Sequence, residues 1–199
     1  MNSQLTLLAG YESGHAVVFT LDPEFNIWRT TYSSKPHSQP VLSLDYRPYP
    51  EPLTFYTSSA DSIIAKHEIQ PNTDPENSEE SPSQIINTRH AGQQGLSLRS
   101  DGRIFATAGW DSRIRVYTAK NMKEVAVLKW HREGCYAVAF ARIFDRRDEP
   151  RAGDGENKEV AQANDTITTV SQQRENRTRQ AHMLAAGSKD GRVSLWEIF

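Results

Sequence analysis

The chain has 199 residues and a formal net charge of −2, with 25 acidic and 23 basic side chains. This near balance disfavours a nucleic-acid-binding protein, which usually carries a basic excess or a basic stripe. No apolar run approaches the ~18 residues that a membrane-spanning helix needs. The single cysteine, Cys135, rules out an intrachain disulfide and a cysteine zinc cluster.

One sequence pattern recurs four times along the chain. It consists of small residues, a tight polar turn and an alternating strand that closes on a ring side chain, at residues 8–19, 56–67, 106–117 and 185–196. The closing positions Phe19, His67, Tyr117 and Trp196 are 48, 50 and 79 residues apart, and removing a polar segment of about 36 residues at 145–180 reduces the last spacing to about 43. Periods of ~40–50 residues are typical of repeat folds.

A second element, a histidine followed by an alternating strand, precedes the later three copies. The histidines are His37, His90 and His131. Taken together, the patterns predict an all-β chain of fourteen strands. In chain order the predicted strands are 5–9, 15–21 and 26–32; 41–46, 53–58, 63–69 and 84–89; 94–99, 103–108, 113–118 and 123–130; and 136–143, 183–187 and 192–198.

These repeats resemble the WD40 family, in which each repeat forms a four-stranded blade of a β-propeller. The segments WHRE at 130–133 and LWEI at 195–198 stand where the family has its glycine–histidine and tryptophan–aspartate pairs. The resemblance implies that residues 1–199 form a partial propeller of about three and a half blades. Because the pattern begins and ends inside a blade, we expect the C-terminal half of a larger, seven-bladed propeller or a truncated product.

The resemblance also assigns structural roles to the repeat positions. In the family, the histidine, a strand hydroxyl, the turn aspartate and the closing aromatic form a buried hydrogen-bonded set. The match implies such a set for His90, Thr107 and Asp111 with Tyr117, and another for His131 and Asp190 with Trp196. The copy with His37 and Asp61 closes on His67 instead of an aromatic, and the first copy has Ser13 in place of the aspartate. We expect these two blades to be held more by packing than by the polar set.

Two segments interrupt the strand rhythm. Residues 70–83 carry no positive charge and almost no apolar side chain, and residues 145–180 mix both signs with few large apolar residues. Neither can bury enough surface to offset the entropy of ordering, which predicts a disordered acidic loop and a disordered polar insertion. A sharper hypothesis for the first is a phosphorylated docking segment, since Thr73, Ser78 and Ser81 lie among carboxylates or before proline.

The sequence predicts no enzyme, no cofactor and no metal site. Four of the six histidines occupy repeat positions, where a structural role suffices, and His15 and His182 lack a matching carboxylate pattern. Cys135 opens an apolar strand and is expected to be buried and unreactive. A hydrolytic propeller, the enzymatic alternative, would need carboxylates or a metal converging in a central channel.

Trp110 is the expected protein-contact residue. It comes directly before Asp111, and the other copies have Ala60 and Lys189 at this position, which are the further candidate contact residues. The repeat itself therefore does not require an aromatic there. In WD40 propellers this position commonly faces the surface where partners dock, and tryptophan is over-represented among binding hot spots. The alternative is that Trp110 packs back over its own blade.

A closer resemblance is carried by four stretches outside the two interrupting segments. The stretches LLAGYESG, GWDSRIRVY, VLKWHREGCYAVAFA and LAAGSKDGRVSLWEIF are similar to the family of fungal ASTRA-associated WD-repeat proteins, whose animal relatives are described as guanine-nucleotide-binding-protein beta-subunit-like. This resemblance implies a nuclear, chromatin-linked scaffold, with the cytoplasm as a second compartment. Its implied partners are subunits of an ASTRA-type complex that includes the co-chaperone of phosphatidylinositol-kinase-like kinases, with no direct contact to nucleic acid or membrane. A G-protein-beta-like signalling scaffold and a WD40 adaptor of another complex are the alternatives.

Overall fold

The computed structural model describes residues 5–47, 52–69, 80–143 and 181–198. These residues form fourteen β-strands and no helix, which confirms the predicted all-β class. The strands are β1 (Thr6–Gly10), β2 (Ala16–Asp22), β3 (Ile27–Ser34), β4 (Val41–Arg47), β5 (Leu53–Ser59), β6 (Ile63–Ile69), β7 (Gln84–Asn87), β8 (Gln93–Leu98), β9 (Ile104–Gly109), β10 (Arg113–Thr118), β11 (Glu124–Lys129), β12 (Cys135–Phe140), β13 (Met183–Ser188) and β14 (Val193–Glu197).

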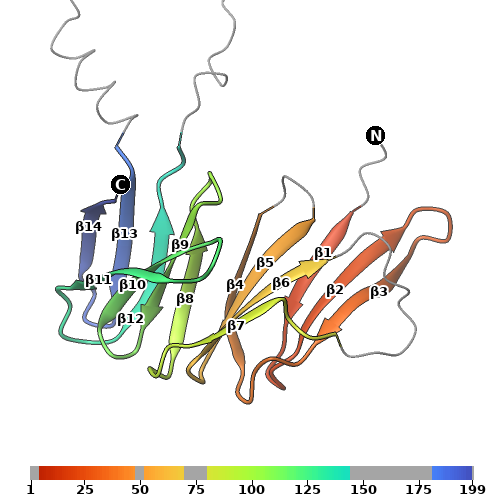
Figure 1. Ribbon diagram of the computed structural model, residues 1–199, viewed down its shortest axis with the longest axis horizontal. Coiled ribbons are helices and arrows are strands. Elements are labelled where there is room, and N and C mark those ends of the chain that lie inside the picture. Colours follow the sequence, from red (N-terminus) through yellow and green to blue (C-terminus); the bar gives the residue numbers. More distant parts are fainter. Residues whose placement is uncertain (1–4, 48–51, 70–79, 144–180, 199) are drawn as a thin grey trace, which may run out of the picture.

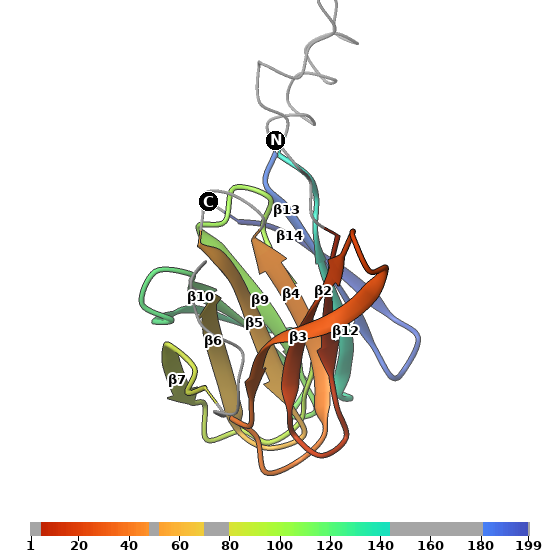
Figure 2. The same cartoon turned by 90° about the vertical axis from the view of Figure 1, so that its right-hand side faces the viewer.

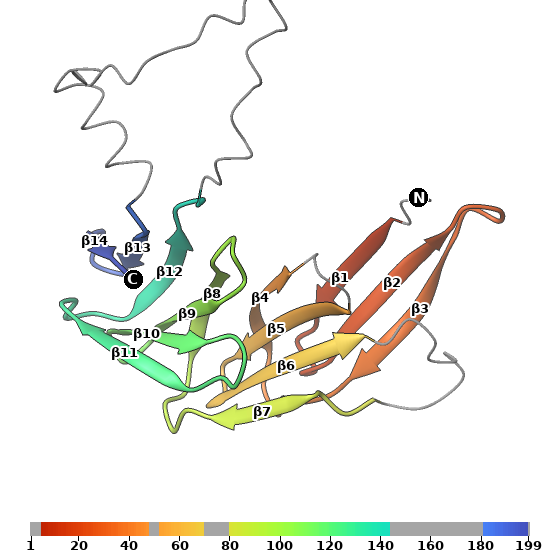
Figure 3. The same cartoon turned by 45° about the horizontal axis from the view of Figure 1, so that its top comes forward.

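The strands assemble into four separate antiparallel sheets, each a meander of consecutive strands. Blade one is β1-β2-β3, blade two β4-β5-β6-β7, blade three β8-β9-β10-β11 and blade four β12-β13-β14. The blades follow one another in chain order along an arc (Figures 1 and 3), and Figure 2 shows them stacked behind one another when viewed from the blade-one end. This arrangement is a partial β-propeller, as the repeats predicted.

The recurring aspartate shapes the turn between the two middle strands of a blade. The carboxylate of Asp61 accepts a hydrogen bond from the backbone N–H two residues later, at 2.8 Å, and Asp111 and Asp190 do the same at 3.3 and 3.1 Å. An aspartate that bonds its own backbone two residues on is a strong turn former. In two of these turns the residue between the aspartate and the bonded N–H has a left-handed conformation, with φ of +63° at Ser112 and +76° at Gly191.

Most predicted strand boundaries differ from the structure by one to three residues. The strand expected at 84–89 ends at Asn87, because Arg89 has a left-handed φ of +61° that no strand accommodates. The strand expected at 136–143 is shorter and begins one residue earlier, at Cys135–Phe140.

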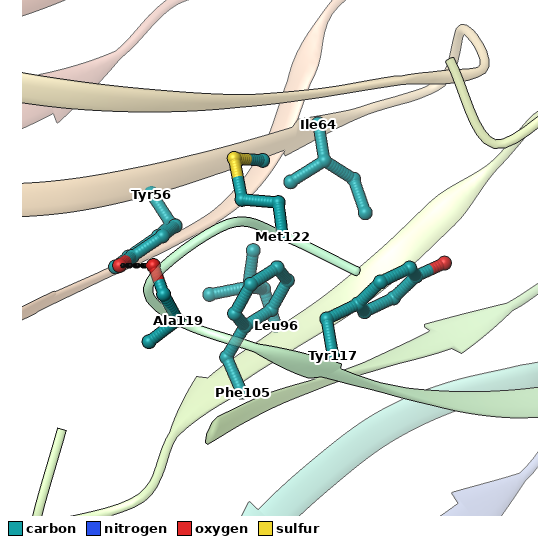
Figure 4. Packing of buried hydrophobic residues seen from close by; sticks show 7 residues of the cluster. All are labelled: Tyr56, Ile64, Leu96, Phe105, Tyr117, Ala119 and Met122. Carbon is teal, nitrogen blue, oxygen red and sulfur yellow. Dashed lines mark hydrogen bonds between the residues drawn. The ribbon is translucent and has the colours of Figure 1, made fainter. Parts of the chain in front are cut away.

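Apolar side chains fill the spaces between successive blades. Between blades two and three, Met122 and Ala119 from the β10–β11 turn cover Tyr56, Ile64, Leu96 and the stacked rings of Phe105 and Tyr117 (Figure 4). The blade-one/two cluster consists of Ala16, Val18, Tyr32 and Phe55, and the blade-three/four cluster of Ala106, Ala108, Ile114, Val116, Cys135, Leu184 and Ala186. Each blade is therefore stabilised by burying one face of its sheet on the next.

The strand topology defines two opposite faces of the molecule. The turn face carries the aspartate turns at Asp61, Asp111 and Asp190, together with the connections between blades. Since antiparallel strands alternate in direction, the β6–β7 and β12–β13 connections open on the other side, which we call the insert face. Disorder is predicted for residues 70–83 and 145–180. Of these, only residues 80–83 are among the residues that the structure describes.

Candidate functional site

The three positions predicted to contact partners all lie in turns on the turn face. Trp110 is in the β9–β10 turn, Ala60 in the β5–β6 turn and Lys189 in the β13–β14 turn. The side chain of Trp110 is 46% exposed, so it offers a large apolar area to solvent. Lys189 is also exposed, whereas Ala60 is half-buried and has little side chain to offer.

Trp110 is held in one orientation by its own blade. Its backbone N–H donates to the Gly92 carbonyl at 2.9 Å, and its indole Nε1–H donates to Gln94 Oε1 at 2.9 Å. The ring lies against Gly92, where a Cβ atom would come within 2.0 Å of indole carbon Cδ2 and where φ is +74°. Only glycine fits this position. The ring therefore packs against its own blade on one side and is exposed to solvent on the other, which combines the docking and the packing alternatives predicted from the sequence.

Blade four adds a second aromatic side chain, Tyr136, close to the backbone of Trp110. Gly134 lies between them: a Cβ there would be 3.1 Å from the Trp110 carbonyl oxygen and 3.2 Å from Tyr136 Cε1. Tyr136 is 45% exposed. The Lys189 backbone N–H donates to the Gly134 carbonyl at 2.9 Å, which brings the lysine turn to the same place. We call Trp110, Tyr136 and Lys189 the turn-face patch.

Sequence reasoning missed Tyr136. The alternating pattern predicted only that it lies in a strand. Its closeness to Trp110 depends on the packing of blade four against blade three. The small residue Gly134, two positions before it, is the one local feature that permits this approach.

Beneath the turn face, blade two contains a continuous buried hydrogen-bond relay. His37 Nδ1 is 3.3 Å from Asp61 Oδ1, and His37 Nε2 is 2.8 Å from Thr57 Oγ1. Thr57 Oγ1 is in turn 3.0 Å from His67 Nε2, and His67 Nδ1 is 2.8 Å from the hydroxyl of Tyr32 in blade one. The relay therefore connects two blades.

The donor and acceptor groups of these side chains fix the direction of every hydrogen bond in this relay. A carboxylate can only accept, so His37 Nδ1 donates to Asp61, and the other nitrogen of a neutral His37 accepts from Thr57. The single Thr57 proton is then used, so His67 Nε2 donates to Thr57 and His67 Nδ1 accepts from Tyr32. Burial lowers the pKa of His67 to about 3 and also lowers the pKa of His37, so both rings are neutral, as this assignment requires.

This relay corrects the expectation that blade two would be held mainly by packing. His67 replaces the usual closing aromatic yet performs both of its roles. Its ring stacks on Phe55 with centroids 4.2 Å apart and an interplanar angle of 8°. The imidazole ring can stack as a phenyl or indole ring does, and it can also hydrogen-bond through both of its nitrogens. The sequence pattern did not reveal this double role.

In blade three the buried set predicted for His90, Thr107 and Asp111 is not completed. The Thr107 hydroxyl donates to Gln93 Oε1 at 2.7 Å, and the Gln93 amide donates to the His90 carbonyl at 2.9 Å. The His90 side chain is 46% exposed, with Nδ1 3.5 Å from Asp111 Oδ2. The left-handed residues of the β7–β8 connection turn the histidine outward, and the buried amide of Gln93 takes its place.

Asp111 instead pairs with Arg115 on the neighbouring strand. Arg115 Nη2 and Nη1 donate to its two oxygens at 2.6 and 3.1 Å. Burial opposes ionisation of Asp111, but the hydrogen bonds and the charge of Arg115 outweigh it and lower the pKa of the carboxyl group. Tyr117 packs in the blade-two/three cluster, where burial raises the pKa of its hydroxyl well above the ordinary value.

Blade four forms part of its predicted set through a residue that was not predicted. Ser194 Oγ is 2.8 Å from His131 Nε2 and accepts from the Trp196 indole N–H at 2.9 Å. Ala186 occupies the position of Thr57 and Thr107, so no strand hydroxyl is present there. Asp190 bonds the Arg192 backbone rather than His131.

The remaining candidate for chemistry is Cys135, and it is buried as predicted. Burial raises the pKa of its thiol to about 11, which keeps it protonated and a poor nucleophile at neutral pH. Among the described residues, no three or more His, Cys, Asp or Glu side chains are grouped so as to hold a metal ion. In that part of the chain there is likewise no helix with the length and hydropathy to cross a bilayer.

Comparison with known proteins agrees with this geometry. Residues 83–118, which span β7 to β10, match the family model "WD domain, G-beta repeat". ASTRA-associated protein 1 of Verticillium alfalfae is 50% identical over 98% of this chain and 47% of its own length. The proteins of that name from Penicillium rubens and Schizosaccharomyces pombe are 44% and 33% identical, over 100% and 97% of this chain and 52% and 44% of theirs. The chain thus spans about half the length of the curated relatives it matches.

Proposed function

We propose that this chain is a non-enzymatic scaffold that binds other proteins, because residues 83–118 match the WD40 family model and the chain is similar to fungal ASTRA-associated protein 1. The observation that carries the proposal is the half-exposed indole of Trp110, fixed by Gly92 and Gln94 on the turn face. A rigid, preorganised aromatic loses little entropy on binding and buries a large area. Such a surface suits protein recognition.

We further propose that its partners are the subunits of an ASTRA-type complex and that it acts in the nucleus. The names of the relatives support association with that complex, and they do not favour the alternative of a G-protein-beta-like signalling scaffold. The resemblance also implies that the complex includes the co-chaperone of phosphatidylinositol-kinase-like kinases. Affinity purification of the tagged protein with mass spectrometry tests this: co-purification of those subunits is expected, and their absence beside other stable partners would contradict it.

Trp110→Ala tests the turn-face patch. We expect it to weaken partner binding by ~2 kcal/mol or more, because a hot-spot aromatic loses its buried contact. We expect only a small fall in melting temperature, since about half of the ring is already exposed. Thermal melting and quantitative pull-down of the same purified variant measure the two effects separately.

Trp28→Ala is the matched control, because Trp28 in β3 is 47% exposed but lies in blade one, away from the patch. Its partner binding should equal that of the wild type. If Trp110→Ala instead lowers the melting temperature by several degrees while binding per folded molecule stays intact, Trp110 serves the blade and not the partner.

A further inference from the structure

The three junctions between successive blades are built in the same way. In each blade, strand pairing places one apolar residue opposite the closing ring: Leu7 opposite Phe19, Phe55 opposite His67, Phe105 opposite Tyr117 and Leu184 opposite Trp196. Phe55, Phe105 and Leu184 are 1%, 0% and 0% exposed, because each packs on the blade before it. We call this side of a blade, marked by the residue opposite the closing ring, its rear face.

The other side of each blade, which we call its front face, receives the rear face of the next blade. It is marked by the residue three positions before the closing ring, which is Ala16, Ile64 and Ile114 in blades one to three. These side chains are 0% exposed, and each lies in one cluster with the rear-face residue of the next blade. A contact between an aliphatic front face and a bulkier rear face is therefore repeated three times along the arc (Figure 3).

Blade four has a front face that is open to solvent. Val193 and Leu195 occupy the positions that Ile114 and Val116 have in the blade before. Ile114 and Val116 are 0% exposed, whereas Val193 and Leu195 are 65% and 67% exposed. The described part of the chain therefore leaves this face without the rear face that covers its counterparts.

Blade one has the matching open rear face. Leu7, its marker residue, is 50% exposed, and Leu5 is 60% exposed. The Leu21 N–H donates to the Leu5 carbonyl at 2.9 Å, and Leu21 pairs on its other side with Trp28, which is 47% exposed. Directly opposite residues of neighbouring strands share one side of a sheet, as do residues two apart in a strand. Leu5, Leu7 and Trp28 therefore form one apolar surface.

We infer that the front face of blade four binds the rear face of blade one in a second copy of this chain. Both halves of the repeated contact are present and exposed, at opposite ends of the arc (Figure 3). Within the molecule front faces meet only rear faces, and the two differ in side-chain size, so a front face fits another front face less closely. The contact is heterologous, because each copy uses a different surface for it.

Two such contacts join a pair of arcs into a ring. Each copy supplies four blades, so two copies make eight, which is within the range of known propellers. A heterologous contact that closes leaves no open end, whereas one that does not close produces open filaments. The closed pair covers both apolar ends of each copy, and burying apolar surface is the main favourable term in association.

Complementation between two variants tests this pairing. Val193→Lys with Leu195→Lys disables the front face, and Leu5→Lys with Leu7→Lys disables the rear face. In sedimentation velocity we expect a wild-type dimer, and each variant alone should be a monomer. An equimolar mixture should regain a dimer with one copy of each variant, because the front variant keeps its rear face and the rear variant keeps its front face. This mixed dimer has one contact instead of two, so it should form only at higher protein concentration.

Ile85→Lys with Val125→Lys is the control, because these side chains are 47% and 55% exposed on the outer strands β7 and β11 and the substitutions add the same charge. The control should remain dimeric, and far-UV circular dichroism should show every variant folded. Four results would overturn the inference: a monomeric wild type, a rear variant that dimerises on its own, a mixture that stays monomeric, or equal loss of the dimer in the control.

The inference is independent of the proposed scaffold function. Trp110 lies in the β9–β10 turn and belongs to neither of the two open faces. Trp110→Ala should therefore leave the dimer intact, and the front and rear variants test only the contact between copies. A failure of one idea leaves the other standing.

Discussion

At the scale of single residues, His67 decides how blades one and two are joined. It lies between Tyr32 and Thr57 in the relay, and it stacks on Phe55. Its ring is fully buried, so a proton on Nδ1 would break the bond from Tyr32 and place an unpaired charge in the core. The neutral ring is therefore a condition of this interface.

This burial predicts a specific dependence of stability on pH. The folded pKa of His67, about 3, lies below its ordinary value of 6.5, so between these values the unfolded chain binds more protons than the folded one. The free energy of unfolding should be highest above pH ~6.5 and fall by up to ~1.4 kcal/mol per pH unit as the pH drops toward 3. His67→Phe keeps the stacking and removes the titration, so its denaturation midpoints should depend less steeply on pH. An equally steep dependence would show that His67 is not the cause.

At the scale of elements, the side chains of β4 hold the backbone of β8. Leu96 N–H donates to Ser43 Oγ at 3.0 Å, and Leu98 N–H donates to Asp45 Oδ2 at 2.7 Å. β8 is the first strand of its blade and pairs with β9 on one side only, so these N–H groups have no strand partner. Side chains of the preceding blade satisfy them, which joins the blades without a continuous sheet.

Asp45→Ala should destabilise this junction by ~1–3 kcal/mol, because it leaves the Leu98 N–H without its acceptor. The melting temperature should fall by several degrees, measured by circular dichroism. Asp45→Asn retains an oxygen acceptor and should cost much less. Equal losses for the two variants would mean that charge, rather than the hydrogen bond, matters at this position.

At the scale of the whole molecule, the outer faces of both end blades are apolar and exposed. Val193 and Leu195 stand at the same distance after Asp190 as Ile114 and Val116 after Asp111. Ile114 and Val116 are 0% exposed because blade four covers them, whereas Val193 and Leu195 are 65% and 67% exposed. At the other end, Leu7 is 50% exposed while its counterpart Phe55 is 1% exposed. Both ends therefore present the surfaces that pack blade on blade elsewhere in the arc.

The 199-residue chain on its own should consequently self-associate, because apolar patches of this kind are buried wherever a partner surface is available. Replacing Val193 and Leu195 together with lysine should shift it toward the monomer in sedimentation velocity. Val125→Lys on the outer strand β11, which is 55% exposed, is the control and should not change the distribution. A wild-type chain that is already monomeric at every concentration would contradict this expectation.

The sequence by itself determined the elements and their order. Alternating strands, aspartate turns and a period of ~40–50 residues predicted all fourteen strands and their grouping into four sheets, because these features depend on interactions between neighbouring residues. The buried state of Cys135 followed in the same way from its apolar strand.

Only the tertiary structure decided which polar groups meet. Gln93 replaces His90, Ser194 replaces a strand hydroxyl, and His67 replaces an aromatic. Each exchange depends on the orientation of side chains between strands and blades, and a buried polar group accepts whichever partner reaches it within hydrogen-bond distance. The approach of Tyr136 to the backbone of Trp110 likewise joins residues far apart in the chain. The pattern within one repeat carries no information about this approach, because it is created by the packing of one blade on the next.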